Sequence, residues 1–428
     1  MNSQSFDSQQ LAYMRRRSDR FKFVGYGGYP ADKVQWAAFL SLLQQKVSAT
    51  KKIPEHFSRF TIKRKSGLTA DSLEAALILR KVNDNIRRAY GIKQPSRSEI
   101  THEVAQLLRE NTTKHLIKID IRSFFESVPV NQLYRQLEQD RKLSTLTLQL
   151  LADFLRICKE RQFHGLPRGL SLSATLAELH VRDLDRQIRA IPGVYHVNRY
   201  VDDIIVFCFK SPDETRGLVR KILKSFGLRI NSEKHKVFNV HMNCEFKCPA
   251  KSACVRKGVC QATAGPKPQV LDFLGYAFEF KKENAQSNSV SLRFSARKIT
   301  TLKTRMIRAF GDYRATGDVV LLGRRIKYLA GNHKLKSSQN RGRLRAGVFY
   351  SYMQCDVSDP AFLNQLKDLD VFLRTQIYAA TAGVPHALSP IDALRLVRIS
   401  FAAAVAHRIT NKAAPTGSGL VKECWKYG

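Results

Sequence analysis

The sequence has few acidic residues for its length, and this deficit is its most unusual bulk property. Its 428 residues include 36 Asp and Glu against 72 Lys and Arg, which gives a formal net charge of +36 at pH 7. Self-repulsion of this size opposes a compact fold unless a polyanion offsets it. We therefore expect a phosphate-rich partner and binding that weakens with salt.

Long apolar runs are also missing. No stretch of about 18 apolar residues occurs, so no segment is a candidate for a transmembrane helix. The first residues, 1–5, lack the apolar region of a signal peptide. We expect a cytoplasmic protein without a membrane partner, whose eight cysteines are reduced.

Paired C-x2-C knuckles are absent from the one segment that is rich in cysteine. Its four thiols are spaced C-x3-C-x5-C-x5-C, at Cys244, Cys248, Cys254 and Cys260. One interpretation is a structural Zn²⁺ site, because four thiolates can enclose that ion. We favour ordinary reduced cysteines in a basic loop, since the spacing is not that of the common zinc motifs.

Against this background, two adjacent carboxylates stand out. Asp202 and Asp203 follow Tyr200-Val201 and separate two runs that are rich in apolar and β-branched residues. This pattern predicts a β-hairpin with the acidic pair at its tip. Asp120 ends another strand-like run, residues 116–121, and an aspartate there is costly unless a metal ion or a buried arginine compensates it.

If the two strands are neighbours, three carboxylates converge on one point. Such a cluster repels itself unless divalent cations neutralise it. Two Mg²⁺ ions held in this way suit in-line nucleotidyl transfer, in which one ion activates the attacking 3′-hydroxyl and the other stabilises the leaving pyrophosphate. The sequence therefore predicts metal-ion chemistry on a polyanion.

The pattern of the rest of the chain predicts helices that alternate with short strands. A basic turn follows a strand in residues 57–67, and a Gly-Pro-Gly turn leads into a helix in residues 165–178. We expect helices at about 70–90, 98–110, 145–160, 171–190 and 213–226, and a strand at 273–278. From about residue 294 we expect helix throughout, with Ser295 as the first cap and Lys298 reaching outward.

In order and spacing, these segments resemble a reverse transcriptase over residues 57–280. The strand ending at Asp120 is similar to that family's first palm motif, and Tyr200-Val201-Asp202-Asp203 is similar to its YxDD box. The resemblance implies an α+β fold of the right-hand polymerase type, in which fingers and palm with an antiparallel sheet precede an α-helical thumb and C-terminal domain. It divides the chain into a basic N-terminal extension (1–50), fingers and palm (51–285) and a helical thumb and C-terminal RNA-binding region (286–428).

The resemblance also implies roles for individual residues. Asp120, Asp202 and Asp203, with the backbone of Ile121, would hold two Mg²⁺ ions. Phe125 matches a steric gate that favours dNTPs, although a core aromatic is the alternative. Lys234 matches a lysine that protonates pyrophosphate, although a solvated lysine is the alternative.

Further residues would contact nucleotide and primer. Those implied in nucleotide binding are Lys63, Lys65, Pro167 and Gly169. Those implied in a primer-grip hairpin are Phe273, Leu274, Gly275 and Tyr276. An arginine that many relatives place after the finger turn is missing, and Arg80 is a weak substitute.

No integrase, protease or RNase H module is visible. Residues 79–88, 165–178, 325–332 and 346–350 resemble bacterial defence-associated, abortive-infection reverse transcriptases. Within them, the most similar subgroup is the first enzyme of two-polymerase type 3 antiphage defence systems. This implies a dedicated noncoding RNA template, a DNA product, dNTPs, a second reverse transcriptase as partner and an oligomeric state.

Three alternatives stay open. The enzyme could make DNA without a template or from its own primer, as some abortive-infection relatives do. It could be a non-catalytic RNA-binding scaffold, against which the intact aspartate triad argues. It could be an RNA-dependent RNA polymerase, against which Phe125 and the YxDD form argue.

Overall fold

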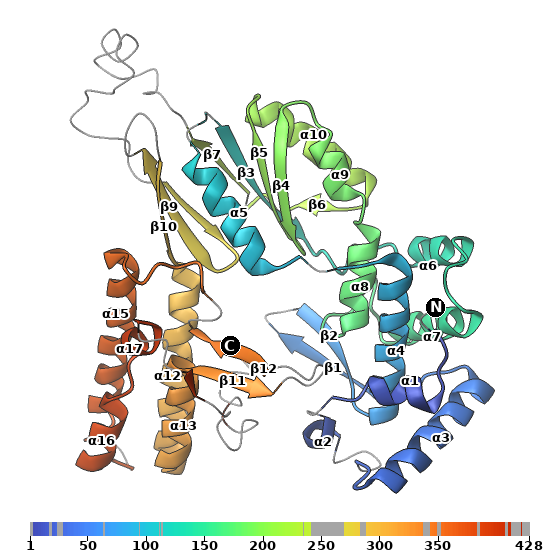
Figure 1. The fold of residues 1–428 in the computed structure, drawn as a ribbon, viewed down its shortest axis with the longest axis horizontal. Coiled ribbons are helices and arrows are strands. Elements are labelled where there is room, and N and C mark those ends of the chain that lie inside the picture. The colour runs from blue at the N-terminus through green and yellow to red at the C-terminus, as the bar shows by residue number, and fades with distance from the viewer. Residues whose placement is uncertain are drawn as a thin grey trace. The chain divides into compact units, whose positions relative to one another are not determined.

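A computed structural model provides the fold (Figure 1). The residues it describes are 3–16, 19–23, 29–62, 65–93, 95–110, 112, 114–233, 235–240, 269–282, 288–336, 343–348, 352–382, 386–406, 410–411 and 421. The chain divides into two compact units. Unit 1 comprises residues 1–95 and 114–239, and unit 2 comprises residues 96–113 and 240–428.

Unit 1 is built around a five-stranded sheet with the order β4-β5-β3-β6, in which β7 also pairs with β3. Its strands are β3 (Lys114–Arg122), β4 (Val194–Tyr200), β5 (Asp203–Cys208), β6 (Arg229–Ile230) and β7 (Lys236–Val240). The pairs β4–β5, β3–β5 and β3–β6 are antiparallel. The predicted hairpin and the predicted antiparallel sheet are confirmed.

Unit 1 also contains helices. They are α1 (Ser8–Tyr13), α2 (Asp19–Lys22), α3 (Lys33–Thr50), α4 (Leu73–Tyr90), α6 (Val130–Gln139), α7 (Thr145–Glu160), α8 (Ser171–His180), α9 (Leu184–Arg189) and α10 (Pro212–Ser225). Ser72, Ser144 and Ser211 each cap a helix by accepting a hydrogen bond from a backbone N–H in its first turn. The single helix expected over residues 171–190 is two helices, because Val181 ends α8.

The apolar core of unit 1 is continuous and includes the N-terminal residues. Leu11, Leu43 and Val47 are buried in the same cluster as Ile119 on β3 and Val206 on β5. Residues near the N-terminus therefore help to support the sheet on which the acidic residues lie.

A separate hairpin in unit 1 pairs β1 (Phe57–Ile62) with β2 (Lys65–Ala70). Gly67 lies inside β2 opposite Phe60. A Cβ at Gly67 would lie 2.3 Å from the Phe60 ring and 2.8 Å from the carbonyl oxygen of Arg168. This glycine therefore allows the hairpin to approach the turn at residues 165–170.

Unit 2 combines two small sheets with helices. One sheet has the order β10-β9-β8 and the other β12-β11-β13. The strands are β8 (Gln269–Phe273), β9 (Tyr276–Lys282), β10 (Asn288–Phe294), β11 (Asn332–Lys336), β12 (Arg343–Gly347) and β13 (Thr410–Asn411). The helices are α5 (Arg97–Arg109), α12 (Ala296–Thr316), α13 (Val319–Ala330), α15 (Pro360–Tyr378), α16 (Pro390–Val397) and α17 (Phe401–Ala406).

Two expectations for this unit need correction. The chain is not helical throughout from residue 294, because β11 and β12 form an antiparallel hairpin. Lys298 does not reach outward but lies over the ring of Tyr352, with its Nζ 5.0 Å from the ring centroid. The expected cap is confirmed, since the Ser295 hydroxyl accepts a hydrogen bond from the backbone N–H of Lys298.

Among the helices in the described ranges, none is long and apolar enough to cross a membrane.

Candidate active site

The three sequence-predicted aspartates meet at one end of the β3–β5 pair. Asp120 lies directly opposite Asp203 in the antiparallel register. The backbone N–H of Ile121 donates to the carbonyl oxygen of Asp202 over 2.9 Å. Val201, in the tip of the β4–β5 hairpin, has φ 59°, a left-handed conformation that is unusual for a β-branched residue and is typical of functional sites.

Burial and charge both act on this cluster. Burial is the main cause that raises the pKa of Asp202, and the nearby Asp120 raises it further. Arg168 and Lys65 lower it in part. The site thus carries an excess of negative charge that bound cations would relieve.

Asn231 fixes the orientation of Asp120, a contact that our sequence analysis missed. Its side-chain amide donates to the Asp120 carboxylate over 3.1 Å, and its backbone N–H donates to the Asp120 carbonyl oxygen over 2.8 Å. Asn231 follows β6 in the sequence, and its hydrogen bonds to Asp120 could not be predicted from the sequence.

The donor chemistry fits Mg²⁺, which prefers carboxylate and carbonyl oxygens. Asp120, Asp202 and Asp203 supply only oxygen donors at a point of unbalanced negative charge. Within the described ranges, however, no three His, Cys, Asp or Glu side chains already stand together at the spacing of a metal site. The pairing of β3 with β5 therefore brings the backbones of the three aspartates together. Their carboxylates would still have to rotate toward a shared metal ion.

The turn at residues 165–170 joins this cluster to the β1–β2 hairpin. Leu166 donates its backbone N–H to the carbonyl oxygen of Phe125 over 2.9 Å, and Leu68 on β2 donates to that of Arg168 over 2.8 Å. Gly165 must be a glycine here, because a Cβ would lie 2.6 Å from the carbonyl oxygen of Glu126.

Pro167 and Gly169 occupy the same turn. Pro167 is buried, and Gly169 has φ 97° with Phe60 close above it. Both are therefore placed to hold the shape of the turn, while Lys65 is exposed at the start of the adjoining β2.

Phe125, the predicted steric gate, is half-buried beside this turn. Its ring meets that of Phe124 edge-on at 5.5 Å. The guanidinium of Arg168 lies 5.1 Å from its centroid and forms an ion pair with Glu126 at 3.0 Å. Burial is the largest single influence and would raise the pKa of Glu126, but the hydrogen bond and charge of Arg168, a backbone hydrogen bond and the charge of Lys65 together lower that pKa.

A buried ion triad supports the hairpin and was not predicted. Arg199, next to Tyr200 on β4, contacts Glu178 of α8 at 2.9 Å and Asp185 of α9 at 2.8 Å. Its exposed fraction is 8% and that of Glu178 is 7%. The triad therefore ties the strand that leads into the acidic tip to two helices.

Not every predicted residue can be placed at this site. Lys63, Lys234 and the four cysteines at 244, 248, 254 and 260 lie outside the described residues. Arg80 is not available to a nucleotide, because its guanidinium is paired with Asp19 at 2.7 Å.

The predicted primer-grip residues form a tight turn in unit 2. Phe273 ends β8 and Tyr276 begins β9, while Leu274 and Gly275 between them have φ values of 50° and 80°. Arg97 of α5 donates to the carbonyl oxygen of Leu274 over 2.8 Å, and its guanidinium lies 5.1 Å from the centroid of the Tyr276 ring.

Comparison with known proteins adds one informative match. A family model described as "Reverse transcriptase (RNA-dependent DNA polymerase)" matches residues 63–278, half of the chain. No curated protein matches the sequence. Among solved structures, telomerase from Candida albicans, in complex with a fragment of telomeric RNA, is similar with 15% identity over 70% of this chain and a TM-score of 0.31. This chain covers 50% of the telomerase chain.

Proposed function

This chain belongs to the reverse transcriptase family, and we propose that it is an RNA-directed DNA polymerase that adds dNTPs to a 3′-hydroxyl. The observation that supports this activity best is the placement of Asp120 opposite Asp203, with Asp202 at the adjoining turn. Three acidic side chains at one strand end are what nucleotidyl transfer requires.

Each residue around the cluster then has a distinct task. Bound at Asp120, Asp202 and Asp203 beside Ile121, Mg²⁺ would activate the 3′-hydroxyl and stabilise the charge on pyrophosphate. Asn231 orients Asp120. Lys65 and Arg168 provide positive charge toward the triphosphate, as their influence on Asp202 indicates.

Phe125 is proposed to discriminate the sugar. The turn at residues 165–170, with Pro167 and Gly169, is proposed to position template and incoming nucleotide. We further propose triphosphate binding by Lys63, proton donation by Lys234 and primer contact by residues 273–276. A structural Zn²⁺ ion at the four cysteines is a lesser proposal, which metal analysis of the purified protein would test.

Paired substitutions test the polymerase activity. We expect Asp202→Ala with Asp203→Ala to lower dNTP incorporation by about three orders of magnitude or more, because several kcal/mol of transition-state stabilisation is lost. RNA binding and the unfolding temperature should not fall, because the change removes carboxylates that repel one another. The matched control is Asp213→Ala with Glu214→Ala, an exposed adjacent acidic pair on α10. A double variant at 202 and 203 that polymerises as fast as this control would refute the assignment.

We propose a narrower role in antiphage defence, in which a dedicated noncoding RNA is the template and a second reverse transcriptase is a partner. The support is the sequence resemblance to defence-associated enzymes, together with the net charge of +36. Sequencing the RNA and DNA that co-purify with the protein tests this role. One enriched RNA with complementary DNA supports it, whereas DNA without a complement supports untemplated synthesis and RNA without DNA supports a scaffold.

A further inference from the structure

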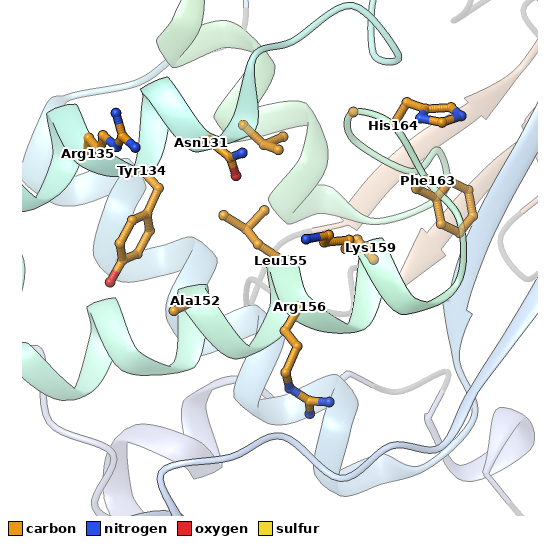
Figure 2. Close-up of a pocket in the computed structure, with 12 residues that line it drawn as sticks. Asn131, Tyr134, Arg135, Ala152, Leu155, Arg156, Lys159, Phe163 and His164 are labelled. Carbon is orange, nitrogen blue, oxygen red and sulfur yellow. The ribbon is translucent and has the colours of Figure 1, made fainter.

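A pocket in unit 1 takes no part in the reaction proposed above. It lies between α6 and α7 and is closed at one side by the loop at residues 163–165 (Figure 2). Its volume is about 630 Å³, which is in the usual range for small-molecule sites. We call it the α6–α7 pocket.

The inner surface of the α6–α7 pocket is apolar and partly aromatic. Tyr134 of α6, Leu155 of α7 and Phe163 of the loop line it, with the two rings toward opposite sides of the view in Figure 2. Cys158 contributes a neutral wall, because burial raises the pKa of its thiol to about 12. Asn131 adds one amide group. A flat ring with polar edges suits such a surface, since bases stack on aromatic side chains and use their edges for hydrogen bonds.

The rim of the pocket carries two cations, Arg135 and Lys159, and the imidazole of His164. Arg135, Lys159 and His164 line it and are exposed, and in the described part of the chain none of them has an ion pair. Cationic side chains without a carboxylate partner favour an anionic ligand, above all a phosphate.

The fourth basic residue of the pocket is already occupied. Arg156 contacts Glu160 at 2.6 Å, Glu55 at 2.7 Å and Asp153 at 2.8 Å. Figure 2 shows its side chain directed away from Asn131 and the other α6 residues. Arg156 is therefore engaged by carboxylates and is not available to an anionic ligand.

The pocket shares a wall with the turn of the candidate active site. Gly165 lines it, and the next residue, Leu166, donates to the carbonyl oxygen of Phe125 over 2.9 Å. Side chains on the inner side of the pocket also pack toward the turn. Tyr134 and Leu155 line the pocket and, on their other side, lie in one cluster with Leu166 and Leu176, which do not line the pocket. Tyr134 and Leu155, which an occupant of the pocket would contact, therefore also lie beside Leu166 of the turn, so that moving them can shift the turn.

We propose that the α6–α7 pocket binds a nucleotide unit, with the base on the apolar inner surface and the phosphate at the basic rim, where Figure 2 shows Lys159 beside Leu155 and places Arg135 and His164 toward opposite sides. We further propose that its occupancy shifts the turn at residues 165–170 and so changes the rate of dNTP addition. The binding stands independently of the polymerase activity, whereas the effect on rate rests on it. The nucleotide has two sources, a free nucleotide or an unpaired residue of bound RNA.

Binding is tested first, with mant-ATP as the probe and EDTA present. The protein is the full chain carrying Asp202→Ala and Asp203→Ala, so that the reaction and its metal ions play no part. We expect saturable binding that becomes roughly tenfold weaker or more with Arg135→Glu plus Lys159→Glu, because two charge-assisted contacts are lost. The matched control is Lys221→Glu plus Lys224→Glu, two exposed lysines of α10, which should leave affinity unchanged.

The second probe separates the two sources. An oligonucleotide that contains 4-thiouridine is photocrosslinked to the protein, and the crosslinked peptides are mapped. Crosslinks on the peptides of Tyr134 and Phe163 that disappear in the Arg135→Glu/Lys159→Glu variant, without mant-ATP binding, identify RNA as the source. If mant-ATP affinity is the same in that variant as in the Lys221→Glu/Lys224→Glu control and no such crosslinks form, the proposal is wrong.

The effect on rate is measured with Leu155→Trp, which places an indole in the pocket. We expect it to abolish mant-ATP binding and to change kcat or KM for dNTPs several-fold in the otherwise wild-type enzyme. Lost binding with unchanged kinetics would overturn the coupling to the turn. Should Leu155→Trp fail to fold, the exposed Arg135→Glu/Lys159→Glu variant takes its place: dNTP kinetics that respond to added mant-ATP in wild type but not in this variant support the coupling, and a response that is equal in both refutes it.

Discussion

At the scale of single residues, the carboxylate of Asp202 is held in an unfavourable state. Its pKa is raised by burial and by Asp120, so the folded protein holds a proton there more tightly than the unfolded chain does. This contribution to stability is fully present below the unfolded pKa and is lost as pH rises through the folded pKa. At neutral pH the charged side chain therefore lowers the free energy of unfolding.

We accordingly expect Asp202→Asn to raise the unfolding temperature at pH 7 by a few degrees. The difference from wild type should shrink as pH falls toward 4, because the wild-type side chain then becomes protonated. Thermal unfolding at a series of pH values in EDTA measures this. Equal unfolding temperatures of variant and wild type at pH 7 would show that Asp202 carries no electrostatic strain.

The ring of Phe125 gives a second prediction at this scale. It is half-buried against Phe124, and it lies five residues after Asp120. If it excludes a 2′-hydroxyl, Phe125→Ala should raise the ratio of rNTP to dNTP incorporation by roughly tenfold or more, as the loss of a steric contact in a binding site does. Primer extension with each nucleotide set measures the ratio. An unchanged ratio together with a lower unfolding temperature would identify Phe125 as a core residue.

Some residues of the candidate active site could be predicted from the sequence, and others could not. Asp120, Asp202 and Asp203 could be predicted, because each is an acidic residue in an apolar strand-like run, a pattern with few explanations. Asn231 and Arg168 could not, because a polar residue in a loop reveals nothing of its partner. Their hydrogen bonds to Asp120 and Glu126 join segments that are 111 and 42 residues apart.

At the scale of helices and strands, the triad of Arg199, Glu178 and Asp185 decides how firmly β4 is held. Removing one partner from a buried ion pair leaves an uncompensated charge, which usually costs about 3–5 kcal/mol. We expect Arg199→Met to lower the free energy of unfolding by about that amount and to reduce dNTP incorporation through the adjoining hairpin. Urea denaturation and primer extension measure the two effects.

A more exposed ion pair provides the control. Arg88 and Asp84 pair at 2.9 Å on the outside of α4, where such pairs contribute at most about 0.5 kcal/mol. Arg88→Met should therefore alter stability little. If Arg199→Met and Arg88→Met destabilise the protein equally, the triad does not support β4 in the way we infer.

Lys298 on α12 gives a prediction for unit 2. Burial lowers its pKa to about 8, and Arg305 and Arg97 add positive charge around it. The unfolded chain keeps this proton up to about pH 10.5, so it binds more protons than the folded state between pH 8 and 10.5. Stability should therefore rise with pH across this window.

Lys298→Met should remove that rise and should stabilise the protein at pH 7 by about 1–3 kcal/mol. Urea denaturation at pH 7, 8, 9 and 10 measures it, with Lys303→Met on the same helix as the control for loss of a charge. A wild-type protein whose stability does not increase from pH 8 to 10 would contradict the inferred burial of a charged lysine.

Helices, strands and caps could be predicted from the sequence where they depend on residues close together in the chain. The Ser295 cap of α12 and the β4–β5 hairpin depend on residues within a few positions, and both are present. The strands β11 and β12 were missed because their pairing with each other and with β13 is set by tertiary contacts. The break between α8 and α9 was missed for a similar reason, since Val181 and Leu184, on either side of it, are both buried in the core of unit 1.

At the scale of the whole molecule, several of the carboxylates form ion pairs with arginines that are largely buried. Asp19, Glu178 and Asp312 are each paired with an arginine that is at most 14% exposed. Each of these pairs cancels its own charges, so the net charge of +36 comes from the remaining basic residues. The chain should therefore bind phosphate backbones strongly and with little regard to sequence.

This surplus predicts a steep salt dependence for binding of the full chain to RNA. Each phosphate that a lysine or arginine neutralises releases condensed counterions, with a slope of about −0.7 per contact for single strands. For roughly six contacts, affinity should fall by about two to three orders of magnitude between about 50 and 200 mM KCl. Titrations at several KCl concentrations measure the slope, and mant-ATP binding serves as the control, since one nucleotide has few phosphates and should give a shallow slope. An RNA slope as shallow as that of mant-ATP would mean that most of the positive charge does not contact nucleic acid.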